Sequence, residues 1–300
     1  MILAGLLVAV AIALYWPCPL LLARVRWSSR APRASIVLWQ AIGVAGAVAA
    51  IGAGFSVALA PMHASVLDGL GRLLHQAEAG RPLQGLGVYA ALGLQVATDV
   101  TVVLVLGLAI TTVRLWRTRA RHRRLLRLVA GRSERAPGAF LLDDQRATAY
   151  YLPGLRSHVV VSAGTLGLLG ADELSAVLAH ERGHAHGRHG IVMLPFASLD
   201  TLLGWVPYAR YARTAVASLL EMAADDFAQR QIGSGPLVSA LLGMAKVGVA
   251  PTCALGAADV DVPIRIARLL EPSHRSKGVA IWAAGAALTI LIIPMTGLVV

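Results

Sequence analysis

Two histidines and a glutamate in the middle of the chain have the spacing of a helical metal site. Residues 180–184 have the sequence His-Glu-Arg-Gly-His, so His180 and His184 stand four positions apart. Side chains at positions i and i+4 share one face of an α-helix, and two imidazoles there can bind one Zn²⁺ ion. Glu181 lies close enough to polarise a metal-bound water. The pattern predicts two zinc ligands and a catalytic glutamate; a polar patch on an exposed helix is the alternative.

A catalytic zinc ion needs a third protein ligand, which should come from another element. The sequence has no third histidine at the spacing of an extended His-rich zincin motif, so a carboxylate is the candidate. Glu221 follows His184 by 37 positions, and Asp225 stands four positions further on the same predicted helix face. We expect Glu221 to bind the metal and Asp225 to accept a hydrogen bond from a ligand histidine. On spacing alone, both could equally be solvent-facing acids.

Three further polar residues bear on this site. Hydrolysis of a peptide needs a positive donor for the developing oxyanion, and Arg265 is the candidate. An arginine that forms a salt bridge or faces lipid is the alternative for this position. His186 and His189 follow the first motif but do not share its face, so we expect them on the surface rather than among the ligands.

Local patterns predict the elements that carry these residues. Turn residues separate strand-like runs at 139–142, 147–152 and 158–162. Apolar periodicity predicts a helix that begins near Asp172, carries residues 180–184 and ends between 187 and 190. Further helices are expected over 115–130, 210–231 and 263–270. The apolar stretch 190–209 cannot be a membrane span if His184 and Glu221 bind one metal, so we expect it to be partly helical and buried or against the bilayer surface.

The composition predicts a membrane protein. Hydrophobic residues make up 57% of the chain and charged residues only 14%, against about 25% charged in soluble proteins. Four stretches, 2–22, 36–60, 86–113 and 279–300, reach the ~20 apolar residues that a span needs. We therefore expect a mainly α, multi-pass membrane protein with four transmembrane helices. Three of them, with short loops, occupy residues 1–113, an α+β zincin-like metallopeptidase domain occupies 114–278, and the fourth occupies 279–300.

The basic residues predict the orientation of this protein in the cell membrane. Of the 27 Lys and Arg residues, only Arg72 and Arg81 lie in the loop 61–85, and the other 25 lie on the opposite side. The positive-inside rule places those 25, and with them the metallopeptidase domain, in the cytosol. The net charge of +11 then reflects topology and contact with anionic lipid, so the bilayer is an expected partner and direct nucleic-acid binding is not expected. Asp99 lies inside the third span, and intramembrane acids are functional candidates by default. Because Gln95 and Thr98 are adjacent, Asp99 could equally sit in the outer half of the span with access to water, and it has no assigned role.

The sequence resembles the membrane zinc peptidases of the BlaR/MecR type and, more distantly, the HtpX-like peptidases. The matching runs are VVVS at 159–162, ELSAVLAHERGH at 173–184 and EMAAD at 221–225, together with the layout of three spans, a domain and a fourth span. The resemblance implies that Glu221 is the third zinc ligand. It also implies that the strand near 158–162 is a sheet edge that pairs with an extended substrate. The antibiotic-sensing members carry an extracellular domain after the last span, which this sequence does not contain, so β-lactam binding is not implied.

Three hypotheses on function follow from these patterns. The first is an integral membrane zinc-dependent endopeptidase that hydrolyses a protein or peptide substrate, such as a cytosolic transcriptional repressor in a signalling pathway. The second is a housekeeping protease for the quality control of membrane proteins. The third is a non-catalytic, zinc-binding membrane signal transducer, and the intact Glu181 argues against it.

Overall fold

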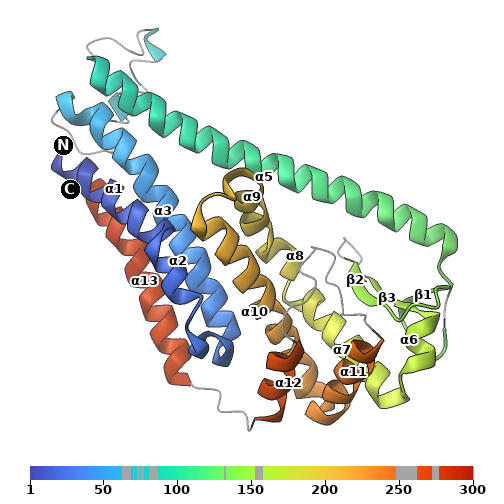
Figure 1. The fold of residues 1–300 in the computed structure, drawn as a ribbon. Helices are drawn as coiled ribbons and strands as arrows, with labels where there is room; N and C mark the ends of the chain where they lie inside the picture. Colours follow the sequence, from blue (N-terminus) through green and yellow to red (C-terminus); the bar gives the residue numbers. More distant parts are fainter. Residues whose placement is uncertain are drawn as a thin grey trace.

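The computed structural model describes residues 1–62, 87–131, 133–152, 158–247, 262–271 and 277–299, together with a few positions between 69 and 80. Long apolar helices stand side by side at one end of the molecule, and shorter helices with a small sheet lie at the other (Figure 1). The predicted mainly helical fold with a small sheet is therefore confirmed. Most of the loop 61–85 and the segment before residue 262 fall outside the described residues.

The first group of elements contains the apolar helices. In chain order these are α1 (Ile2–Tyr15), α2 (Pro17–Leu22), η1 (Arg26–Arg30), α3 (Pro32–Leu59), η2 (Ala60–Met62), α5 (Val88–Val129) and α13 (Lys277–Val299). Within the described residues, four helical segments are long and apolar enough to cross a membrane: Ile2–Leu22, Pro32–Leu59, Val88–Val129 and Gly278–Thr296. The apolar window of α3 is 56% buried, against 11–17% for the other three, so α3 is the central helix. The two chain ends lie beside each other (Figure 1).

Helix α5 is longer than a bilayer span. Its 42 residues form one unbroken helix, which corresponds to a length of about 63 Å at 1.5 Å per residue. The predicted third span and the predicted basic helix over 115–130 are therefore a single element. The helix runs along one side of the molecule from the apolar bundle to the sheet (Figure 1).

The second group opens with a three-stranded sheet. Its strands are β1 (Ala139–Leu142), β2 (Ala149–Leu152) and β3 (His158–Ser162), in the order β1-β3-β2. Strand β3 pairs in parallel with β1 and antiparallel with β2. The expectation that residues 158–162 form a sheet edge is wrong, because neighbours occupy both sides of β3. Strand β2 lies at one edge of the sheet and contacts α7.

Among the described residues, seven helices follow the sheet before α13. They are α6 (Ala163–Leu168), α7 (Ala171–His186), α8 (His189–Val192), α9 (Leu194–Leu203), α10 (Pro207–Ile232), α11 (Ser234–Lys246) and α12 (Val262–Leu270). The helices predicted to begin near Asp172, over 210–231 and over 263–270 correspond to α7, α10 and α12, whereas α6 and α11 were not predicted. The stretch 190–209 is divided between α8, α9 and the start of α10. The apolar helical stretch His189–Leu203 is too short to count as a span.

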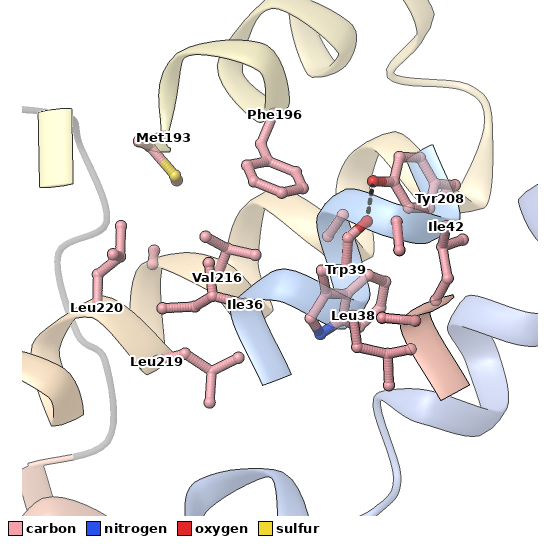
Figure 2. Packing of buried hydrophobic residues seen from close by; sticks show 14 of the residues in the cluster. Ile36, Leu38, Trp39, Ile42, Met193, Phe196, Tyr208, Val216, Leu219 and Leu220 are labelled. Atoms are coloured by element: carbon pink, nitrogen blue, oxygen red, sulfur yellow. Dashed lines mark hydrogen bonds between the residues drawn. The ribbon is translucent and has the colours of Figure 1, made fainter. Parts of the chain in front are cut away.

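An apolar cluster joins the two groups of elements. Ile36, Trp39 and Ile42 of α3 pack with residues of α9 and α10, among them Phe196 and Val216 (Figure 2). The hydroxyl of Tyr208, at the start of α10, donates a hydrogen bond of 2.7 Å to the backbone carbonyl of Trp39. Because this bond satisfies a buried phenol, it helps to hold α10 in place against the central apolar helix.

Candidate metal centre

Three side chains from α7 and α10 converge at one point. His180 and His184 lie one turn apart on α7, and their Nε2 atoms are 3.1 Å apart. The carboxylate of Glu221, from α10, places Oε2 3.4 Å from His180 Nε2 and Oε1 3.4 Å from His184 Nε2. All three side chains are buried. The structure thus brings together the three residues that the sequence predicts as metal ligands, and their ligand atoms lie within 4.8 Å of one another.

The spacing of these atoms leaves room for one metal ion between the three side chains. Metal–ligand distances of about 2.0–2.1 Å in a tetrahedron imply distances of about 3.3 Å between ligand atoms. The two Nε2 atoms are 3.1 Å apart, and each lies 3.4 Å from a different oxygen of Glu221. Among the described residues, Glu221 Oε2 is buried without a hydrogen bond, although it lies 3.1 Å from a guanidinium nitrogen of Arg265. A buried polar atom without a hydrogen bond is costly, and a bound metal ion would satisfy this oxygen. Two imidazoles and a carboxylate also suit zinc chemically.

Gly183 allows α7 and α10 to approach closely enough to form this site. A Cβ atom at position 183 would lie 3.1 Å from Ala224 Cα and 3.2 Å from Phe227 Cβ. These neighbours on α10 follow Glu221 by less than two turns. A larger residue at 183 would push the two helices apart and withdraw the Glu221 carboxylate from the histidines.

Glu181 lies beside the three converging side chains. Burial, helped by the negative charge of Glu221, raises the pKa of Glu181 to about 7. The backbone N–H of Tyr151 in β2 donates a hydrogen bond to its carboxylate. A carboxylate with a pKa near neutrality can both accept and return a proton at physiological pH, as a general acid–base catalyst must.

Asp225 lies beside the ring of His180, and the hydrogen bond predicted between them stays a prediction. One of its carboxylate oxygens lies 2.9 Å from His180 Nδ1, the ring nitrogen directed away from the metal position. The side chain is fully buried, yet Arg265 and His180 hold the pKa of Asp225 below its usual range against the effect of burial. An ionised carboxylate at Nδ1 orients the ring and leaves Nε2 directed at the metal position.

Arg265, on α12, forms part of the same cluster. It donates two hydrogen bonds to Asp225, of 2.8 Å from Nε and 2.7 Å from Nη2. Its Nη1 lies 3.1 Å from Glu221 Oε2, and only 2% of its surface is exposed. The guanidinium therefore neutralises two buried acids and fixes their orientation, which is the salt-bridge alternative raised by the sequence. That Arg265 also stabilises the developing oxyanion stays a prediction.

His189 contributes to the metal centre, which the sequence did not predict. It was expected on the surface, but it is 6% exposed, and its Nδ1 lies 2.8 Å from His184 Nδ1. The helix stops at Gly187, and Arg188 adopts a left-handed conformation with φ 47°, which turns His189 back toward α7. Burial lowers the pKa of His184 to about 3 and that of His189 to about 4, so both rings are neutral.

Neutral rings at this distance have defined hydrogen-bond roles. If His184 uses Nε2 for a metal, its Nδ1–H donates to Nδ1 of His189, whose own proton is then on Nε2. The signal in the sequence was the glycine that ends the helix, since a residue beyond the break no longer obeys the helical periodicity. His186, before the break, is exposed as expected.

The comparisons with known proteins relate this part of the chain to a peptidase family. Residues 115–245 match the model of peptidase family M48, a family of zinc metallopeptidases. The match covers the whole of α7 and α10 and hence every candidate ligand, and it supports a metallopeptidase. No curated protein and no solved structure matches the chain.

Proposed function

We propose that this chain is an integral membrane zinc-dependent endopeptidase whose active site is the cluster on α7, α10 and α12. The observation that carries the proposal is the convergence of His180, His184 and Glu221, whose ligand atoms lie within 4.8 Å of one another, with Glu181 beside them. The match to the M48 family over the same segment supports it.

The chemistry divides between the bound ion and the protein. A zinc ion at this position would supply Lewis-acid polarisation of a peptide carbonyl and a bound water of lowered pKa. The Glu181 carboxylate takes a proton from the attacking water and passes it to the amine nitrogen of the leaving group. Asp225 and Arg265 hold His180 and Glu221 in position throughout.

Strand β2 offers a place for an extended substrate. It pairs with β3 on one side only within the described part of the chain, and its Tyr151 N–H points at Glu181. An extended peptide that adds to this edge would lie across the active site, with its backbone held by hydrogen bonds rather than by particular side chains. The substrate strand thus pairs with β2, in place of the strand over 158–162.

The four long apolar helices support insertion in a membrane, and the distribution of basic residues supports a cytosolic active site. Cleavage of one cytosolic repressor, as in the BlaR/MecR type, and degradation of damaged membrane proteins, as in the HtpX-like group, are both compatible with the site. A library of membrane and cytosolic proteins distinguishes them, because the first predicts one dominant cleavage and the second predicts many.

The test compares detergent-purified wild-type protein with Glu221→Ala and Glu181→Gln variants. We expect about one zinc ion per wild-type chain, a sharp loss of zinc in Glu221→Ala, and retention of zinc in Glu181→Gln. With a proteome-derived peptide library, mass spectrometry should detect new termini for the wild type and none for Glu181→Gln. Full cleavage by Glu181→Gln would refute the assigned catalytic base, and equal zinc in Glu221→Ala would refute the three-ligand site.

A further inference from the structure

Helix α5 has one packed face and one open face within its apolar segment. The packed face carries the buried small residues Ala90, Gly93, Ala97 and Gly107. A Cβ atom at Gly93 would lie 2.7 Å from the backbone carbonyl of Gly54, so α3 approaches α5 backbone to backbone. Small residues allow such contact between membrane helices.

The open face has the spacing of a helix-pairing seam. Its residues are separated alternately by four and three positions, and all six are exposed: Gln95, Asp99, Val102, Leu106, Ala109 and Val113. This spacing is that of the a and d positions of a two-stranded coiled coil. The buried residues Gly93, Ala97 and Gly107 each precede a seam residue by two positions. Two positions correspond to a rotation of about 200° around the helix, so the seam lies nearly opposite the packed face. In the view of Figure 1, no described helix or strand covers the outer side of the middle of α5.

Asp99 makes this face unsuitable for contact with lipid alone. It precedes Arg114 by 15 positions, or about 22 Å along the helix, so in a spanning helix it lies within the ~30 Å apolar layer. Gln95 Nε2 donates a hydrogen bond of 2.8 Å to Asp99 Oδ1. Among the described residues Asp99 has no other polar partner, and a carboxyl group facing lipid is costly.

We propose that two copies of this chain associate in the membrane through the seam of α5, as a parallel pair with Gln95 and Asp99 at the contact. Copies inserted in the same orientation place the same residues opposite each other about a two-fold axis along the membrane normal. The Gln95–Asp99 bond uses one of two amide hydrogens and one of two carboxyl oxygens. The second amide hydrogen of Gln95 in each copy then bonds to the second carboxyl oxygen of Asp99 in the other copy, so Gln95 and Asp99 form a self-complementary pair. The inference rests on the proposed membrane insertion of α5 but not on catalysis.

The first test measures the number of chains per particle in lipid nanodiscs by single-molecule photobleaching at several protein densities. Wild-type protein should be a dimer at densities where Asp99→Leu is a monomer, with a dissociation constant raised roughly tenfold or more in the variant. Asp99→Asn, which retains the hydrogen-bonding capacity, should remain a dimer. Zinc content of each variant shows that its catalytic domain is folded. A wild-type monomer at all densities, or equal association of Asp99→Leu, would overturn the proposal.

The second test locates the contact by disulfide cross-linking in a Cys18→Ser, Cys253→Ser background. Leu106→Cys lies in the seam and should form a covalent dimer under mild oxidation. Leu108→Cys is the matched control, because Leu108 is also exposed but stands about 160° around the helix from Leu106. Cross-linking of both positions to the same extent would indicate random collision rather than a seam. Because neither test depends on peptide cleavage, failure of the dimer and failure of the proposed protease are distinguishable.

Discussion

The metal centre and the outer helices distribute polarity in opposite ways. In the cluster on α7, α10 and α12, ionisable side chains are buried, and Asp225 is 0% exposed. Along α5 and α13, large apolar side chains are exposed, such as Leu106 at 53% and Ile281 at 72%. The first arrangement is stable only where every buried charge has a partner, and the second only where the surroundings are themselves apolar. One region is therefore held by pairing of charges and the other by close contact of helices, and substitutions should affect them differently.

The largest expected effect comes from removal of one charge from the cluster. Arg265→Met leaves the buried carboxylates of Asp225 and Glu221 without their cation, and we expect a loss of about 3–5 kcal/mol in the free energy of unfolding. Thermal and chemical unfolding in detergent measure this loss. Arg268→Met is the matched control, because Arg268 lies one turn away on α12 and contacts the partly buried Asp226 at 2.6 Å. Equal losses in the two variants would mean that pairing in the cluster is not what stabilises it.

A smaller effect is expected from the histidine behind the ligand. His189→Phe keeps a ring in the space but removes the acceptor for His184 Nδ1–H, so the affinity for zinc should fall about 10–100-fold. Competition with a chromogenic chelator measures the affinity without reference to activity. The control is His186→Phe, because His186 is the exposed last residue of α7. This variant should bind zinc as the wild type does. An unchanged affinity in His189→Phe would show that the contact between the two rings has no influence on the metal.

The helix-packing region provides the complementary test, with the smallest expected effect. Gly93→Ala places a Cβ atom 2.7 Å from Gly54 O and 2.8 Å from Ala58 N, which are backbone atoms that cannot move aside. We expect a loss of about 1–2 kcal/mol, with zinc affinity unchanged. Tryptophan fluorescence during thermal unfolding in detergent measures the loss. At Gly285 a new Cβ atom meets nothing within 4 Å, so Gly285→Ala should be neutral or slightly stabilising. Equal loss in both alanine variants would show that the close contact of α3 and α5 is not a source of stability.

Sequence reasoning was most successful where the information is local. The separation of His180 from His184, and of Glu221 from Asp225, is one helical turn in each case, so a shared face followed from helix geometry alone. It was least successful where several elements meet. Residues 158–162 were correctly predicted as a strand, but their place in the centre of the sheet depends on which strands pair, and β1 and β2 lie on either side.

The sequence by itself determined the types of residue available for a metal, the helices that carry them and the apolar segments that can enter a membrane, because these depend on periodicity and composition within single elements. Only the tertiary structure decided that Arg265, 40 positions after Asp225 in the chain, forms a double hydrogen bond with it. Likewise, only the left-handed turn at Arg188 returns His189 to His184. These contacts depend on where helices cross and how the chain turns between them, and neither property follows from the residues of one helix.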